Sequence, residues 1–388
     1  MWMVITMHSV GIICEYNPFH NGHLYHLNKV KELFPDDTII LIMSGHFMQR
    51  GEPSIINKWD KTKIAIKYGV DLVVELPFPF ATASADIFGY GALKLLDSLK
   101  VSNLVFGSES DNTESLKRLA DIQINNDDYN FLVKKYMKEG LNYPTATSKA
   151  LSKFDDKTVN TPNDILGLSY IKAIKELNSS IIPHTIKRTS DYHDIFKDNN
   201  VVSASFVRNK LIKNNDVTKY VPKETLKYLK SSIFSEDLFP FLKYKIITNI
   251  EFLDTYHMIN DNLAGRIKKY IVKSHTLDEL IKNIKSKKDT YNKISRALTY
   301  ILCDFKKQDF EKMNDINYIR ILGFSEKGRK YLANIKDKIT IPVVTNFGDI
   351  KNEILQNEMK VTAVYASNLN EKDKVNLIEK EFKTPPIK

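Results

Sequence analysis

The segment EYNPFHNGHLYHL, residues 15–27, places three histidines around a single glycine. It follows the apolar run VGIIC and leads into apolar residues at helical spacing, so it lies where a buried strand turns into a helix. The free N–H groups at the start of such a helix attract a phosphate, and Gly22 lets a nucleotide approach the backbone. His20 and His23 can donate hydrogen bonds to phosphate oxygens without a permanent charge at neutral pH. The segment therefore predicts a nucleotide site with these two histidines as catalytic groups.

Two other uses of this segment have to be weighed. It can be an ordinary strand–helix turn that carries histidines on its surface. It can also bind a metal, because His20, His23 and His26 lie three apart with Glu15 nearby. His20 precedes the helix, however, so only His23 and His26 share a helical face, and no further zinc ligand is evident. We predict no metal site here.

A second polar segment, VSASFVRNKL, lies at residues 202–211 and also begins a predicted helix. Ser203 and Ser205 offer hydroxyl groups at the helix start. Arg208 can neutralise the β- and γ-phosphates of a nucleotide. The alternative is an ordinary capped helix on the surface.

The first half of the chain alternates short apolar runs with amphipathic stretches. Apolar runs predict strands at residues 10–14, 38–45, 70–77, 101–109 and 180–188. Helices are predicted between them, at residues 22–34, 58–68, 83–99, 114–154 and 162–177. Fully apolar strands separated by helices indicate a parallel sheet covered on both faces, a doubly wound, Rossmann-like α/β domain. Ligands bind such sheets at the carboxyl ends of the strands, where residues 15–27 lie.

The second half of the chain has mainly helical spacing. We predict helices at residues 242–260, 263–274, 277–287, 289–305 and 325–336, and a strand at 338–346. The change in pattern divides the chain into a catalytic α/β domain, residues 1–220, and a mainly helical domain, residues 221–388.

Positive charge is concentrated in the second half. The whole chain of 388 residues has a formal net charge of +10. Residues 266–338 alone hold 19 Lys or Arg and 9 Asp or Glu, and 19 minus 9 is the same +10. A local basic surface indicates a polyanionic partner, although a solvated, lysine-rich helical surface would give the same count.

Several classes of protein do not fit this composition. The two cysteines, Cys14 and Cys303, are far apart and offer neither a disulfide framework nor a zinc pattern, as is typical of a reducing cytosol. No apolar run approaches the roughly 20 residues that cross a bilayer. The start, MWMVITMHSVGII, lacks the basic region and the cleavage site of a signal peptide. We interpret it as a short leader that runs into the first strand, with Met7 as an alternative start. We expect a cytoplasmic protein with no membrane association.

HNGH after the first strand resembles the HIGH signature of the nucleotidylyl transferase superfamily, whose members bind ATP and direct attack on its α-phosphate. Residues 202–211 are similar to that superfamily's ISSTxxR element, with Ala204 where the second serine is usual. More of the chain resembles one family, the bacterial tRNA(Met) cytidine acetate ligases. The segments that carry this resemblance are GIICEYNPFHNGHLYHL, MSGHFMQRGEPSIINKW, GVDLVVELP, VFGSES, PNDILGLSYIKAI and TIKRTSDYHD.

The resemblance implies an activity and a set of partners. The family activates acetate with ATP as acetyl-adenylate and transfers the acetyl group to N4 of the wobble cytidine of elongator tRNA(Met). It implies ATP and Mg²⁺ as cofactors, this tRNA and acetate as partners, and no stable protein partner. The basic residues expected to hold tRNA phosphates are Lys268, Lys269, Lys285, Lys287, Lys288, Lys293 and Arg296.

The resemblance also implies an ATP site, residue by residue. The family's ATP loop matches Ile13, Cys14, Glu15, Tyr16, Asn17, Pro18, Phe19, His20, Asn21, Gly22, His23, Leu24, Tyr25 and His26. Its further nucleotide-binding positions match Gly107 in VFGSES, Asn163 in TPNDILG and Arg188 in TIKRTS, and Ser203 and Ser205 join them. Taken without the resemblance, Gly107 can be a simple turn, Asn163 a helix cap and Arg188 a solvated charge.

Two other functions stay open. A nucleotidylyl transferase acting on a small molecule would share the two phosphate-binding elements, but it would not explain the basic half of the chain. A non-catalytic RNA-binding protein with a degenerate nucleotide fold is the other, and the intact HNGH and Arg208 argue against it. Release of pyrophosphate would separate the binding protein from both enzymes. Dependence of the net product on tRNA would separate the two enzymes from each other.

Overall fold

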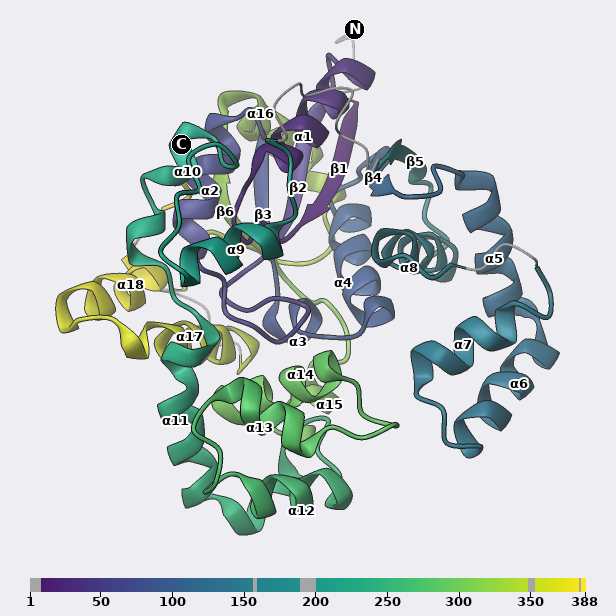
Figure 1. Ribbon diagram of the computed structural model, residues 1–388. Coiled ribbons are helices and arrows are strands. Elements are labelled where there is room, and N and C mark those ends of the chain that lie inside the picture. The colour runs from purple at the N-terminus through teal and green to yellow at the C-terminus, as the bar shows by residue number, and fades with distance from the viewer. Residues whose placement is uncertain (1–7, 156–158, 189–199, 348–352, 384) are drawn as a thin grey trace, which may run out of the picture.

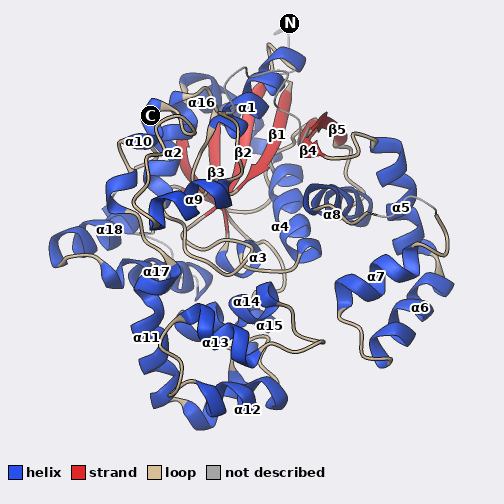
Figure 2. Ribbon diagram, in the orientation of Figure 1, coloured by secondary structure: helices blue, strands red, loops and turns tan. Residues whose placement is uncertain are grey.

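The computed structural model describes residues 8–155, 159–188, 200–347, 353–383 and 385–388. Its centre is a seven-stranded sheet in the order β5-β4-β1-β2-β3-β6-β7 (Figure 2). The first five strands are β1 (Ser9–Cys14), β2 (Thr38–Ser44), β3 (Leu72–Leu76), β4 (Asn103–Ser108) and β5 (Ile182–Lys187). They run parallel, and the chain order reverses on the two sides of β1. The predicted doubly wound arrangement is confirmed, with β1 at the switch point where such sheets bind ligands.

Helices cover both faces of this sheet (Figure 1). One face packs on α1 (Asn21–Leu33) and α2 (Lys58–Lys67), and the other packs on α4 (Ala85–Ser98) and α8 (Pro162–Glu176). Alternate residues of β1 face the two layers, so that Val10 and Ile12 join the first and Ile13 joins the second. This two-sided burial is why the strands are apolar throughout.

Four further helices extend this α/β core. The short helix α3 (Phe78–Ala81) follows β3. Between β4 and α8 the chain inserts a helical arm, which consists of α5 (Thr113–Asn125), α6 (Asp127–Lys138) and α7 (Tyr143–Leu151). Figure 1 shows α6 and α7 projecting beyond the sheet on the side of α8.

The sheet continues with strands from beyond residue 220. Strand β6 (Ile319–Phe324) pairs antiparallel with β3, and β7 (Val343–Val344) pairs parallel with β6. The prediction missed β6, and it expected a strand at residues 338–346 that is longer than the observed β7. The predicted parallel sheet was wrong at this edge, where β6 runs antiparallel to β3. Arg320 interrupts the apolar run of β6, and the short strand precedes a strong helical pattern, α16 (Glu326–Ile335). The division at residue 220 stays a prediction, while the sheet draws on both sides of it.

The remaining helices lie between and after these strands. They are α9 (Ala204–Ile212), α10 (Lys223–Leu226), α11 (Ser235–Thr248), α12 (Asp261–Tyr270), α13 (Leu277–Ile284), α14 (Tyr291–Leu302), α15 (Lys307–Lys312), α17 (Glu353–Tyr365) and α18 (Glu371–Lys383). Helices α11 to α14 share a core of their own. The single helix predicted at residues 242–260 was wrong, because α11 ends at Thr248 and a 3-10 turn follows at Ile250–Thr255. No helix in the described parts of the chain is long and apolar enough to span a membrane.

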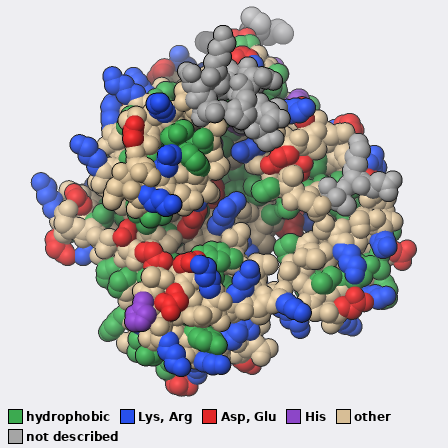
Figure 3. Space-filling model, viewed as in Figure 1, with side chains coloured by type: hydrophobic (Ala, Val, Ile, Leu, Met, Phe, Trp, Pro, Cys, Tyr) green, Lys and Arg blue, Asp and Glu red, His purple; other side chains and the backbone are tan. Residues whose placement is uncertain are grey.

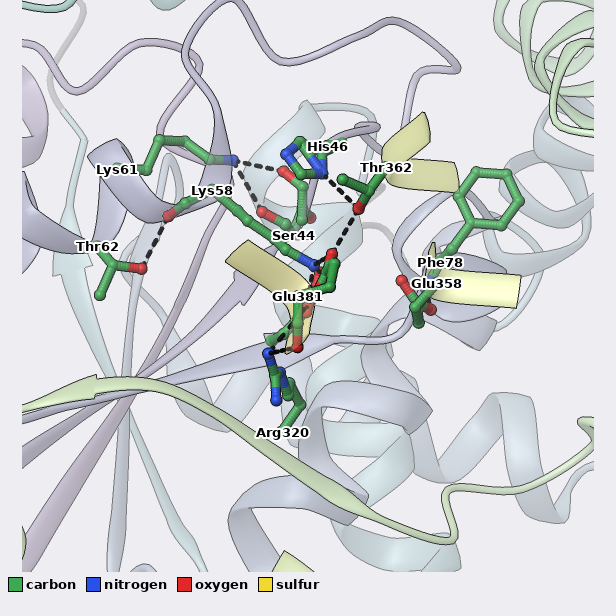
Figure 4. Close-up of polar contacts among 12 residues, drawn as sticks. Ser44, His46, Lys58, Lys61, Thr62, Phe78, Arg320, Glu358, Thr362 and Glu381 are labelled. Carbon is green, nitrogen blue, oxygen red and sulfur yellow. Dashed lines mark hydrogen bonds and ion pairs between the residues drawn. The ribbon is translucent and has the colours of Figure 1, made fainter. Parts of the chain in front are cut away.

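A buried group of charges joins the last helices to the sheet (Figure 4). Lys58 on α2 lies 2.8 Å from Glu75 on β3 and 2.6 Å from Glu381 on α18. Arg320 on β6 lies 3.5 Å from Glu381. Glu358 on α17 accepts a hydrogen bond from the Phe78 backbone at 2.6 Å, and burial together with the charge of Glu75 raises its pKa to about 8. Four separate elements therefore meet in one ion-pair cluster.

Replacement of Lys58 by methionine should destabilise the fold. It leaves the carboxylates of Glu75 and Glu381 buried with fewer cations, and removal of one partner of a buried pair costs about 3–5 kcal/mol. Urea unfolding measures this. Lys63→Met on the same helix is the control, because Lys63 forms an exposed pair with Asp60 whose loss should cost at most about 1 kcal/mol. Equal stabilities of the two variants would contradict the role given to Lys58.

Candidate active site

The HNGH turn follows β1 at the carboxyl edge of the sheet, and its histidines cap α1. His20 Nδ1 accepts a hydrogen bond from the Gly22 backbone N–H at 3.0 Å, and His23 Nδ1 accepts from the His20 backbone at 3.3 Å. The two rings stack with centroids 3.8 Å apart. Because Nδ1 accepts in both rings, the proton of each neutral imidazole is on Nε2. The capping contacts thus leave the Nε2–H of His20 as a donor for a ligand, while His23 also forms a hydrogen bond with the Pro18 backbone.

Burial keeps these histidines neutral. It lowers the pKa of His20 to about 3, and the nearby positive charges of Arg188 and Arg208 act in the same direction. Burial lowers the pKa of His23 well below its usual value and that of His26 to about 4. The Nε2 atom of His26 is buried without a hydrogen-bond partner. At neutral pH the turn therefore offers hydrogen-bond donors and no net charge.

The small size of Gly22 is required by this capping geometry. A methyl group at this position would lie 2.9 Å from Cε1 and 3.0 Å from Nδ1 of His20. The neighbouring Asn21 holds the turn from outside, since its side chain donates to the carbonyls of Asn200 at 3.0 Å and Lys219 at 2.8 Å. The side-chain amide of Asn21 is thus engaged by backbone, and its predicted contact with nucleotide stays a prediction.

The rest of the predicted ATP loop is anchored to its surroundings. The buried side chain of Asn17 accepts from the Ile55 backbone at 2.8 Å. Glu15 accepts from the Gln49 backbone at 2.6 Å, and burial raises the pKa of this carboxyl group. Burial raises the pKa of the Cys14 thiol to about 12, which keeps it protonated. The other members of the loop are buried or half-buried: Ile13, Tyr16, Pro18, Phe19, Leu24 and Tyr25.

Lys61 is a site residue that the sequence did not reveal. Its ammonium group donates to the carbonyls of Glu15 at 3.0 Å, Ser44 at 2.8 Å and Gly45 at 3.0 Å. Three acceptors match the three hydrogens of a charged ammonium, although burial lowers the pKa of Lys61 to about 7. The residue ties the ends of β1 and β2 together. Buried lysines are rare, so helical spacing alone predicts a surface position.

Three more of the predicted ATP-binding residues lie together beside the histidine turn. Arg188 Nη1 donates to Asn163 Oδ1 at 3.1 Å. A methyl group on Gly107 would lie 3.0 Å from the Arg188 side chain, so the glycine leaves room for it. Strand β4 pairs parallel with β1, and β5 pairs parallel with β4, so Gly107 and Arg188 lie at the same edge of the sheet as the turn. The charge of Arg188 also lowers the pKa of both His20 and His23. Residues from β4, α8 and the end of β5 thus converge on the turn after β1.

The ISSTxxR-like element reaches the same place from α9. Ser203 caps α9 by accepting from the Phe206 backbone at 3.2 Å. Arg208 donates to the Asn17 carbonyl at 2.7 Å and forms an ion pair with Glu52 at 2.6 Å. Ser205 lies 3.4 Å from the same guanidinium. A phosphate at this position would compete with Glu52 for Arg208.

Comparisons with known proteins agree with this geometry. A family model described as HIGH Nucleotidyl Transferase matches residues 7–380. A tRNA(Met) cytidine acetate ligase of Geobacillus sp. is 38% identical over 403 residues, which cover 98% of this chain and all of the relative. A ligase of the same name from Clostridium perfringens is 39% identical over 392 residues, which cover 95% of this chain and 97% of the relative.

The chain belongs to the tRNA(Met) cytidine acetate ligase family of HIGH nucleotidyl transferases. Solved structures agree. The chain is 31% identical to Thermotoga maritima TmcAL bound with alpha-thio ATP, with a TM-score of 0.90 over 98% of this chain and 99% of the other. The apo form of that protein gives a TM-score of 0.88 at 32% identity over the same shares. The predicted family, fold class and ATP-dependent ligase class are confirmed.

The predicted tRNA-binding residues of this ligase family member differ in their surroundings. Lys285, Lys287 and Lys288 are exposed in the segment between α13 and α14, and Lys269 is exposed on α12. The other three are engaged: Lys268 with Glu251 at 3.0 Å, Lys293 with Asp289 at 2.7 Å, and Arg296 with the Gln49 carbonyl at 3.4 Å. Figure 3 shows Lys and Arg side chains over the face that α12 to α14 form. The segment at 285–288 is the most accessible part of this set.

Residues 45–53 connect this ligase's helical part to its nucleotide turn. The Gly51 carbonyl accepts from Ser295 at 2.7 Å and Thr299 at 2.9 Å, both on α14. From the same segment, Gln49 contacts Glu15 and Glu52 contacts Arg208. Its observed contacts hold three parts of the ligase together. The Ser44 hydroxyl just before it is buried without a hydrogen-bond partner.

Replacement of Gly22 by alanine should weaken ATP binding about tenfold, because the methyl group displaces the His20 ring and unpairs the Gly22 N–H. Isothermal titration with ATP measures the affinity. Gly265→Ala is the control, since a methyl group there meets nothing within 4 Å. Wild-type ATP affinity in Gly22→Ala would show that the His20 cap is not needed for the nucleotide.

Proposed function

We propose that this protein activates acetate with ATP to form acetyl-adenylate and transfers the acetyl group to N4 of the wobble cytidine of elongator tRNA(Met). The observation that carries the proposal is the HNGH turn, where two neutral histidines cap α1 through Nδ1 and keep their protons on Nε2, with the charges of Arg188 and Arg208 nearby. Relatives of nearly the same length, named for this reaction, support it.

The first step needs positioning more than proton transfer. Acetate is ionised at neutral pH, so its oxygen can attack the α-phosphorus of ATP directly. The new O–P bond forms as the bond from the α-phosphorus to the bridging oxygen breaks, and pyrophosphate leaves. His20 and His23 donate hydrogen bonds to the oxygens on which charge builds, and Arg208 and Arg188 offset that charge. Because acetate is already ionised, no proton has to move in this step.

Mg²⁺ in such a reaction is held largely by phosphates and water, with one or two carboxylates. Glu52 fits this role best, because its carboxylate lies on Arg208 at the predicted phosphate position. Among the described residues, no group of three or more His, Cys, Asp or Glu side chains is arranged to hold a metal ion. When bound with ATP, Mg²⁺ would supply charge neutralisation on the phosphates. We assign no further role to it.

The second step brings the RNA base into the same site. The wobble cytidine has to leave its stack to reach the acetyl group. Its N4 attacks the acetyl carbonyl, the bond between the acetyl carbon and the phosphate oxygen breaks so that AMP leaves, and N4 releases one proton to water. The exposed lysines at 285–288 are suited to hold the RNA backbone during this step. We also propose that the reaction takes place in the cytoplasm without a stable protein partner.

Incubation with ATP, Mg²⁺, radiolabelled acetate and bacterial tRNA tests this function. Label should appear in N4-acetylcytidine after digestion, and only with ATP present. His23→Ala should lose pyrophosphate release about 100-fold or more, because it removes a donor to the developing charge; His275→Ala, at an exposed position, should not. Pyrophosphate release with another carboxylate and no labelled RNA would instead indicate a small-molecule nucleotidylyl transferase.

Binding of tRNA should depend steeply on salt if lysines contact its phosphates. The logarithm of affinity falls by roughly 0.7–0.9 for each phosphate neutralised and each decade of salt. Replacement of Lys285, Lys287 and Lys288 by alanine should therefore reduce this slope by about 2. Fluorescence anisotropy over a series of salt concentrations measures it, with Lys330→Ala on α16 as the control. An unchanged slope in the triple variant would exclude this segment from the interface.

A further inference from the structure

We propose that Glu109 is a positioning residue for the ATP site, which fixes the amide of Asn163 and, through it, the guanidinium of Arg188. This inference rests on the proposed function, because it takes Asn163 and Arg188 as ATP-binding residues. Glu109 directly follows the last residue of β4, Ser108, within the segment VFGSES. Neither its type nor its spacing marked it as a site residue in the sequence.

The carboxylate of Glu109 accepts two hydrogen bonds from the start of α8. Oε1 accepts from Asn163 Nδ2 at 2.5 Å, and Oε2 accepts from the Asp164 backbone N–H at 3.1 Å. Both oxygens are thus committed to neighbouring groups of one helix end. A carboxylate at a helix N-terminus is favoured by the unpaired N–H groups there.

These two contacts decide which way the Asn163 amide faces. An ionised carboxylate only accepts, so Asn163 has to turn its NH₂ group toward Glu109. Its carbonyl oxygen then faces the opposite way, where Arg188 Nη1 donates to it at 3.1 Å. Rotation of the amide by half a turn would set NH₂ against the guanidinium, two donors facing each other. Glu109 therefore determines whether Asn163 can hold Arg188.

The position of Arg188 is what this chain of contacts controls. Its backbone N–H donates to the Ser108 carbonyl at 2.7 Å, while its side chain passes over Gly107. Among the described residues, no carboxylate forms an ion pair with it, so its charge is available to a phosphate. Arg188 follows β5 at the sheet edge where the HNGH turn follows β1, and its charge lowers the pKa of His20 and His23. A displaced Arg188 would take a positive charge away from the nucleotide.

A second set of contacts makes a substitution at Glu109 tolerable for the fold. Asp164 reaches back across the same junction and accepts from Ser108 Oγ at 2.5 Å, from the Glu109 backbone at 3.1 Å and from the Ser110 backbone at 3.0 Å. These bonds use the side chain of Asp164 and only the backbone of Glu109. The turn after β4 therefore stays joined to α8 when the Glu109 side chain is changed.

Glu109→Gln is the test, because it keeps the size and replaces one acceptor oxygen with a donor. The KM for ATP in acetate-dependent pyrophosphate release should rise about tenfold, with kcat changed by about twofold or less. Glu114→Gln is the matched control, since Glu114 pairs with Lys117 on the surface of α5 and should leave KM unchanged. An unchanged KM in Glu109→Gln would overturn the inference.

A double-mutant cycle separates positioning from a general structural effect. Asn163→Ala should raise the KM for ATP, and addition of Glu109→Gln to that variant should raise it no further, because the residue through which Glu109 acts is gone. A further tenfold rise in the double variant would overturn the inference, since Glu109 would then act by another route. ATP binding by the wild-type protein, measured by calorimetry, tests the proposed function separately. Its absence would overturn both.

Discussion

The backbone N–H groups at the start of α1 need acceptors, and the nitrogen atoms of two histidines supply them. This one requirement fixes several properties of the site at once. It sets the orientation of both rings, assigns their protons to Nε2, and demands a residue without a side chain at position 22. The histidines therefore cap the helix through Nδ1 and keep Nε2 for the proposed chemistry, so disturbance of the cap would also disturb that chemistry.

The surroundings of the turn show how the scaffold maintains that arrangement. Lys61 donates hydrogen bonds to carbonyls at the ends of β1 and β2. Asn21 is bonded to the segment before α10, and residues 45–53 join the turn to α14. Each contact comes from a different part of the chain. The predicted phosphate-binding groups from β1, β4, α8, the end of β5 and α9 lie at one edge of the sheet because its switch point brings these elements together.

The sequence predicted what depends on short, regular patterns. The HNGH turn, the five parallel strands and most helices follow from apolar spacing, and the Lys- and Arg-rich surface follows from composition. It could not predict β6, because Arg320 interrupts the apolar run of that strand. The carboxylate that pairs with Arg320 in the fold, Glu381, lies sixty-one residues away in the sequence. Lys61 and Glu109 were missed for a similar reason: their partners are backbone or amide groups brought near only by the fold. Arg296 is the opposite case. Composition groups it with the basic surface, whereas in the fold its side chain donates to the carbonyl of Gln49 in a loop.

The place of β6 in the sheet has a consequence for how the protein is made. During synthesis from the N-terminus, β3 emerges long before residues 319–324, and its outer edge has no strand to pair with. Lys58 and Glu75 likewise emerge well ahead of Glu381. Contacts between residues so far apart in sequence slow folding and leave strand edges exposed in the meantime. The nucleotide-binding half therefore completes its sheet only when the ribosome has released nearly the whole chain, which makes this edge a natural target for chaperones.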